Sequence, residues 1–148
     1  MNYDHAIVRI KEIISKSNPS KILQNCVEFL YENFEEYNWL GIYIVKENNL
    51  ILGPWKGKLA TEHTKIPIGK GICGSAAKSG TTEIISDVSA DKRYLVCFIS
   101  TRSEIVIPIK KNKRVIGEID IDSDIPDAFK REDAVFLEKI ADMLAKYI

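Results

Sequence analysis

The spacing of apolar positions changes twice along the chain and predicts helices at both ends with extended segments between them. Residues 4–15 carry four isoleucines at helical spacing, which predicts an amphipathic first helix. A proline-containing break follows, and Ser20 is the expected N-cap of a second helix whose broad apolar face reaches Phe34. Residues 127–148 again show helical spacing, which predicts a last helix.

Beyond Asn38, aromatic and β-branched residues predominate in short runs, which is typical of strands. We expect a short helix over residues 72–78 that ends at Gly80, a loop with a helical turn over 87–94, and extended segments over 39–45, 50–52, 66–68, 83–85, 104–109 and 114–122. This order predicts an α+β fold, with a central, mostly antiparallel sheet and the N- and C-terminal helices stacked on one face. A ligand site is then expected on the other face, beneath the long central loops.

Composition limits the classes of protein to which the chain can belong. No linker or repeat interrupts the 148 residues, so we expect one domain over residues 1–148. The 21 basic and 21 acidic residues balance, which removes the electrostatic case for binding nucleic acid or an anionic membrane surface. No apolar run approaches the roughly 20 residues that span a bilayer, and the N-terminus lacks the pattern of a signal peptide. Three cysteines do not make a disulfide framework, so a reducing cytoplasm is expected.

The three cysteines differ in their surroundings. Cys26 lies on the apolar stripe of the second predicted helix, which favours a core position. Cys73 follows a glycine-rich segment at the start of a helix, where the helix dipole lowers a thiol pKa, although small residues there also suit close packing. Cys97 lies in an apolar segment between a polar loop and the strand that carries Glu104. This is where an active-site segment would lie, although a buried structural cysteine is also common.

Carboxylates recur on the last two predicted strands. Glu118, Asp120 and Asp122 alternate with isoleucines and therefore share one face, which the residues alone indicate to be solvated. Glu104 begins a strand that is apolar on both faces, so its carboxylate requires a partner or a ligand.

Other features add less. Trp39 and Tyr43 lie four residues apart in a strand and share a face, either in the core or as the wall of an aromatic pocket. His5 and His63 are isolated, and no cysteine or histidine pair has zinc spacing, so no metal is expected. Phosphate-binding and dinucleotide-binding motifs are absent from the sequence, so no cofactor is expected.

Six stretches of the chain together resemble one family. They are Asn38–Tyr43 (NWLGIY), Leu52–Lys58 (LGPWKGK), Ile66–Gly74 (IPIGKGICG), Asp87–Val88, Ser103–Pro108 (SEIVIP) and Ile119–Ser123 (IDIDS). These stretches are similar to the GAF-domain family. Within that family they resemble the free methionine-(R)-sulfoxide reductases, because NWLGIY and LGPWKGK occur in combination with the more widely shared GAF motifs. The resemblance implies a GAF-like fold and a homodimer.

The resemblance also implies an activity. Members reduce free methionine sulfoxide with a catalytic cysteine and use thioredoxin as the final reductant. The implied site residues are Cys97 as the nucleophile, Cys73 as a second cysteine, Glu104, Asp120 and Asp122 as substrate-binding carboxylates, and Trp39 and Tyr43 as an aromatic wall. Glu104 or Asp120, when protonated, would supply the proton to the departing oxygen, and Cys97 would become a sulfenic acid.

Two departures from the family pattern affect the regeneration of Cys97. The family usually has a resolving cysteine after Gly-Lys-x-Ala, whereas here Gly57–Ala60 is followed by Thr61, Glu62 and His63 in a slightly longer loop. Phe98 follows Cys97 where an acid is common. Regeneration then falls to Cys73 or to an external thiol such as thioredoxin. Two non-catalytic alternatives remain open: a GAF module that binds a small ligand, and a redox sensor that uses Cys73 and Cys97.

Overall fold

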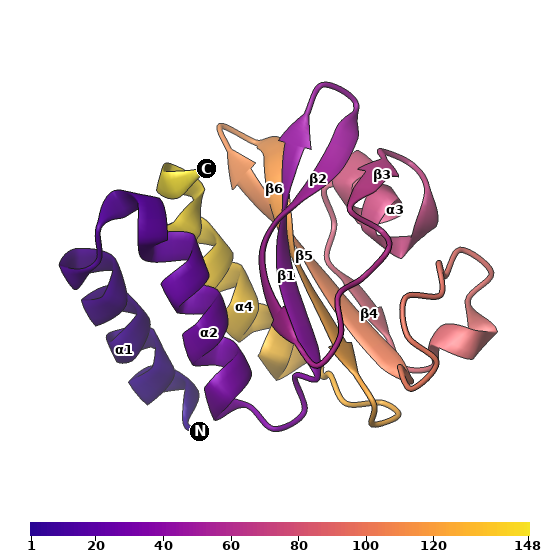
Figure 1. Cartoon of the computed structure of the whole chain (residues 1–148), viewed down its shortest axis with the longest axis horizontal. Helices are drawn as coiled ribbons and strands as arrows, with labels where there is room; N and C mark the ends of the chain where they lie inside the picture. The colour runs from indigo at the N-terminus through magenta and orange to yellow at the C-terminus, as the bar shows by residue number, and fades with distance from the viewer.

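The predicted strands form one antiparallel sheet in the computed structural model, which describes all residues from 1 to 148 (Figure 1). The strand order is β3-β2-β1-β6-β5-β4, and every neighbouring pair is antiparallel. The strands are β1 (Trp39–Lys46), β2 (Asn49–Gly57), β3 (Lys65–Pro67), β4 (Glu83–Ile85), β5 (Ser103–Lys111) and β6 (Arg114–Ser123). The predicted α+β fold is confirmed.

Three helices lie on one side of this sheet: α1 (Tyr3–Lys16), α2 (Ile22–Asn33) and α4 (Arg131–Leu144), which continues into the short 3-10 helix η3 (Ala145–Tyr147) (Figure 1). Helices α2 and α4 pack on the strands, and α1 packs on the outside of these two helices. The main core lies between these helices and the isoleucines of β5 and β6. Cys26 is fully buried in this core, which confirms its structural prediction. None of the helices is both long and apolar enough to cross a membrane.

The other face of the sheet carries the short helix α3 (Gly71–Ser79) and the long segment between β4 and β5, which contains the 3-10 turn η2 (Val88–Ala90) (Figure 1). Helix α3 ends as predicted at Gly80, whose φ of 68° is left-handed and therefore suits glycine. A second, smaller apolar cluster lies between α3 and the sheet. The space under α3 and the long segment is where the predicted ligand site falls.

Two local predictions were wrong. Ser20 does not cap the second helix, because Asn18 caps a 3-10 turn, η1 (Pro19–Lys21), and its side chain accepts hydrogen bonds from the Ser20 backbone amide and hydroxyl. Helix α2 begins after that turn, at Ile22, without a side-chain cap. Strand β2 extends beyond residues 50–52 to Gly57, because its second half pairs with the start of β1 although Gly53 and Pro54 break the strand pattern of the sequence.

Candidate active site

Four carboxyl groups are buried on the sheet face that α3 covers. Glu104 on β5 and Glu118, Asp120 and Asp122 on β6 are each 0–4% exposed, and none of them forms a salt bridge. The sequence-based interpretation of a solvated face on β6 was therefore wrong. An antiparallel sheet leaves one face in water only where no other element packs on it, and here α3 packs on β5 and β6.

The register of the sheet places these acids next to one another. Glu104 lies directly opposite Asp122, and Asp120 lies opposite Val106, so Glu104 is adjacent to both aspartates on the same face. Glu118 lies opposite Tyr43 on β1 and Pro108 on β5.

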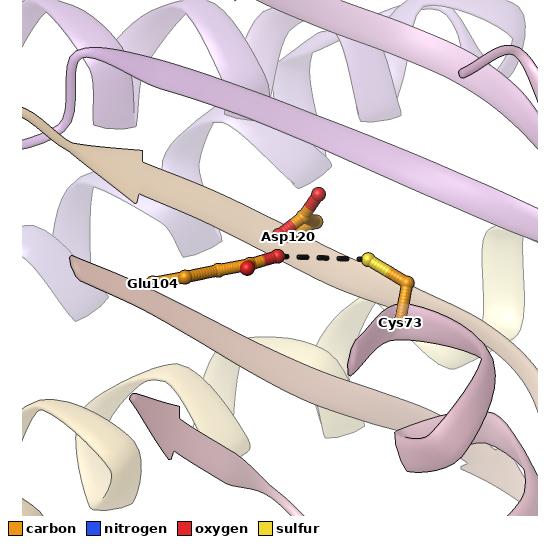
Figure 2. Close-up of side chains that lie close together, drawn as sticks. All are labelled: Cys73, Glu104 and Asp120. Carbon is orange, nitrogen blue, oxygen red and sulfur yellow. Dashed lines mark hydrogen bonds between the residues drawn. The ribbon is translucent and has the colours of Figure 1, made fainter. Parts of the chain in front are cut away.

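Helix α3 places Cys73 directly above this group of acids. The Cys73 thiol donates to Glu104 Oε1 at 3.7 Å, and donor atoms of Cys73, Glu104 and Asp120 all lie within 4.8 Å of one another (Figure 2). Figure 2 shows that the three side chains converge from α3, β5 and β6. Gly71 makes this approach possible, since its φ is 68° and a Cβ there would come within 2.9 Å of Leu95.

Burial dominates the acid–base properties of the group. Loss of hydration raises the pKa of Glu104, Glu118 and Asp122 well above the usual range. Burial also raises the pKa of Asp120, although hydrogen bonding to Glu104 and Cys73 opposes the shift. The pKa of the Cys73 thiol rises, through burial first and then through the neighbouring carboxylates. The lower thiol pKa expected from a helix N-terminus is therefore not found, because burial among acids outweighs the dipole of a nine-residue helix.

These acids make stability depend on pH. Because their pKa is raised in the folded protein, the folded state keeps protons that the unfolded chain releases above about pH 4. The stabilising contribution of these acids to the free energy of unfolding is complete below their pKa in the unfolded chain. It is lost as pH rises through their pKa in the folded protein. We expect the free energy of unfolding to fall in that window by up to about 1.4 kcal/mol per pH unit for each group.

Glu118→Gln tests this dependence, since the amide keeps the shape of the side chain and does not ionise. Urea unfolding measured from pH 5 to pH 9 should show a shallower decline for Glu118→Gln than for the wild type. The exposed Glu62→Gln is the matched control and should follow the wild type. Parallel curves for wild type and Glu118→Gln would contradict the raised pKa of Glu118.

Cys97 lies in the segment between η2 and β5 and is half-buried. Its thiol donates to the Leu95 carbonyl at 3.4 Å. Burial, followed by the charges of Asp122 and Asp120, raises the pKa of Cys97 to about 12, and a contact with Thr61 opposes the shift. At neutral pH the sulfur is therefore a thiol. A cation placed among the carboxylates would offset their charge and favour the thiolate.

Cys97 and Cys73 line the same small cavity. Its walls are formed by Tyr43, His63, Ile66, Ile72, Cys73, Tyr94, Leu95, Cys97, Glu104 and Asp120. The cavity volume of about 20 Å³ holds about one water molecule, so a ligand as large as an amino acid requires the covering segment around Leu95 to move outward.

The remaining predicted site residues line a neighbouring hollow of about 80 Å³. Trp39 and Asp122 lie there with Phe98, whose ring centroid is 6.1 Å from that of Trp39. The structure thus divides the predicted group: Tyr43, Glu104, Asp120 and both cysteines face the first cavity, whereas Trp39 and Asp122 face the second. The segment from Leu95 to Phe98 contributes to both.

Trp39 lies flat against two glycines. A Cβ on Gly41 would come within 2.3 Å of the indole ring, and one on Gly57 within 2.4 Å. The glycines of the NWLGIY and LGPWKGK stretches therefore make room for this ring.

Three residues near the cysteines were not among the predicted site residues. His63 lines the first cavity, with Nε2 3.1 Å from the Val96 carbonyl oxygen, and Thr61 contacts Cys97. The sequence places both in a polar loop, and their contacts with the segment that carries Cys97 left no signal there. Glu118 was assigned to the acidic face of its strand but not to the site, although it shares that face with Asp120, which was assigned to the site.

Comparison with known proteins places this arrangement in a family. Residues 18–148 match the GAF domain. The chain is 35% identical to the free methionine-R-sulfoxide reductase of Escherichia coli, over 85% of this chain and 75% of that protein. The structure of free methionine-R-sulfoxide reductase from Neisseria meningitidis in complex with its substrate superposes with a TM-score of 0.91 at 34% identity, over 98% of this chain and 87% of that one.

A second solved structure agrees. The substrate complex of the Staphylococcus aureus protein fRMsr gives a TM-score of 0.89 at 37% identity, over 99% of this chain and 95% of that one. The chain therefore belongs to the GAF domain family, and its similarity within that family is to free methionine-R-sulfoxide reductases.

Proposed function

We propose that the protein reduces free L-methionine-(R)-sulfoxide to methionine, with Cys97 as the nucleophile. The observation that carries this proposal is the placement of the Cys97 thiol on one cavity with the buried carboxyls of Glu104 and Asp120, each of which keeps one oxygen without a hydrogen-bond partner. A free amino acid brings an ammonium group that these acids can bind, whereas a methionine sulfoxide within a peptide chain lacks it. The similarity to reductases named for this substrate supports the assignment.

The chemistry follows from the positions of these groups. The Cys97 thiolate attacks the sulfoxide sulfur, and a protonated carboxyl of Glu104 or Asp120 gives its proton to the sulfoxide oxygen. The hydroxyl passes to the Cys97 sulfur, so Cys97 becomes a sulfenic acid while the sulfoxide is reduced by two electrons and leaves as methionine. The raised pKa of Glu104 keeps such an acid protonated near neutral pH. Tyr43 on the first cavity, and Trp39 and Asp122 once the covering segment has opened, complete the proposed substrate contacts.

Substrate discrimination tests the proposal directly. Wild-type protein with dithiothreitol should convert free L-methionine-(R)-sulfoxide, and kcat/KM should fall at least about 100-fold for the N-acetylated compound, which has no ammonium group. Methionine release is followed by chromatography. Equal rates for the two compounds would contradict the role of the acids. Binding without turnover would instead support the alternative of a non-catalytic GAF module.

Regeneration of Cys97 is assigned to Cys73 and an external dithiol such as thioredoxin. The Cys73 thiol condenses with the Cys97 sulfenic acid, releasing water and forming a disulfide that the dithiol then reduces. Two observations support Cys73: it lines the same cavity as Cys97, and the loop that follows Ala60 contains no cysteine that could resolve the intermediate.

Cys73→Ser should therefore lower turnover with thioredoxin at least about 10-fold, and by a smaller factor with dithiothreitol, because a small thiol can reach the sulfenic acid directly. Steady-state rates with the two reductants, measured on the same preparations, provide the comparison. If both rates fall by the same factor, Cys73 is not the resolving thiol.

The proposal extends to assembly and compartment. We place the protein in the reducing cytoplasm, where thioredoxin and small thiols are available, and we expect a homodimer. Exposed Val8 on α1 and Val135 on α4, beside a hollow formed by Tyr3, Ile7 and Phe136, support pairing through the helical layer.

A further inference from the structure

The side chains shown in Figure 2 bring together a sulfur and carboxylate oxygens, which are atom types that bind divalent metals. Cys73 Sγ and Glu104 Oε1 are 3.7 Å apart, and an oxygen of Asp120 lies within 4.8 Å of both. A tetrahedral Zn²⁺ ion with ordinary bond lengths separates a thiolate sulfur from a carboxylate oxygen by about 3.6 Å. The first pair therefore already has the spacing of two ligands, and Asp120 needs to shift by about 1 Å. Sequence spacing could not indicate this set, because its members come from α3, β5 and β6.

A second observation points to a cation at this place. Glu118 is fully buried, and neither of its oxygens has a hydrogen-bond partner. One oxygen each of Glu104 and Asp120 is also unpartnered. Glu118 lies near Cys73 and Asp120: after burial and Asp120, the charge of Glu118 contributes to the raised pKa of the Cys73 thiol, and after burial, the charge of Asp120 contributes to that of Glu118. Glu118 does not line the cavity that holds Cys97, so a substrate ammonium bound there would leave it without a partner.

We propose that Cys73, Glu104 and Asp120 bind Zn²⁺ in the resting protein. Glu118 lies outside the group whose ligand atoms are within 4.8 Å of one another, and its carboxyl becomes the fourth ligand by moving toward Cys73. The single thiolate favours Zn²⁺ over Mg²⁺ and Ca²⁺, which take oxygen ligands, and the carboxylates disfavour Cu(I). Binding requires that the thiol and the acids lose their protons, so affinity rises with pH.

The consequence of this site rests on the proposed function. Zn²⁺ occupies Glu104 and Asp120, which the substrate ammonium needs, and it holds the Cys73 sulfur that would resolve the Cys97 sulfenic acid. The metal-bound protein is then an inactive form, and a chelator restores its activity.

Cobalt titration of the Cys97→Ser protein tests the site without any turnover. The expected result is a near-ultraviolet band from sulfur-to-cobalt charge transfer that saturates at one Co²⁺ per chain and that Zn²⁺ abolishes. Adding Cys73→Ser to this background should remove the band, whereas adding Cys26→Ala, which removes a buried thiol outside the site, should leave it. A band that survives Cys73→Ser, or no band in Cys97→Ser, would overturn the proposal.

Isosteric amides test the carboxylates. Because an amide preserves the shape of the acid side chain, these variants also provide a second test if Cys73→Ser does not fold. In the Cys97→Ser background, Glu104→Gln and Glu118→Gln should each raise the Kd for Zn²⁺ at least about 10-fold, as measured with a competing chromophoric chelator. An unchanged Kd in both would overturn the ligand assignment. Failure of the proposed reductase activity is recognised separately. In that case, wild-type protein treated with chelator shows no turnover, independently of the cobalt spectrum.

Discussion

Cys97→Ser is expected to lower kcat for free methionine-(R)-sulfoxide at least about 1,000-fold with dithiothreitol as the reductant. The first step needs a polarisable nucleophile at sulfur, and a serine hydroxyl in the same place neither ionises near neutral pH nor forms a product comparable to a sulfenic acid. Cys73 cannot take over this step, because it is buried on the face of α3 that packs against the sheet, and burial and then the surrounding acids raise its pKa.

A second measurement identifies the intermediate. After one equivalent of sulfoxide and no reductant, dimedone should label Cys97 in Cys73→Ser protein, since the sulfenic acid then has no resolving thiol, and mass spectrometry locates the label. Cys26→Ala is the control for loss of a thiol and should retain turnover, because Cys26 lies in the helical core on the opposite face of the sheet. Substantial activity in Cys97→Ser would remove Cys97 as the nucleophile.

Asp120→Asn should affect two properties of the site in opposite directions. Asp120 raises the pKa of Cys97, so its neutralisation lowers that pKa and makes Cys97 react faster with iodoacetamide at pH 8. The same change removes a charge that would bind the substrate ammonium, so kcat/KM for the free sulfoxide should fall about 100-fold. The variant then has a more reactive thiol and is a poorer enzyme.

This divergence distinguishes substrate binding from general damage. A variant that has merely lost its structure would expose Cys97 and also Cys26, whereas Asp120→Asn should leave Cys26 unlabelled. Glu62→Gln, which neutralises an exposed acid in the loop that contains His63, should change neither rate. If alkylation and catalysis both fall in Asp120→Asn, the electrostatic account of Cys97 is wrong.

The fold was predictable because it depends on local periodicity. The isoleucines of α1, the continuous apolar run of β5 and the alternating residues of β6 gave the correct element types and order, and the terminal helices lie on one side of the sheet as expected. Ser20 failed as a cap because Asn18, two residues earlier, accepts the hydrogen bonds instead. The spacing of apolar residues does not show which of several neighbouring polar side chains accepts the hydrogen bonds at the start of a helical segment.

The site was less accessible to sequence reasoning because its properties arise from contacts between distant segments. Whether β6 faces water or α3 decides the protonation state of Asp120 and Glu118, and no spacing within β6 carries that information. Cys73 shows the same limit: its place at a helix N-terminus suggested a lower pKa, and burial reversed the direction. The division of the predicted substrate residues between two hollows depends on the segment containing Phe98, whose path over the sheet is likewise a tertiary property.

The alternation along β6 also protects the protein against misfolding. Glu118, Asp120 and Asp122 face α3, while Ile119 and Ile121 face the helical core. A slip of one residue against β5 would exchange the two faces and push three carboxyls into the isoleucine core. These three acids thus disfavour competing registers of the hairpin. Two of them, Asp120 and Asp122, are also proposed to bind the substrate, so apolar replacements there would weaken the control of strand pairing as well as the chemistry.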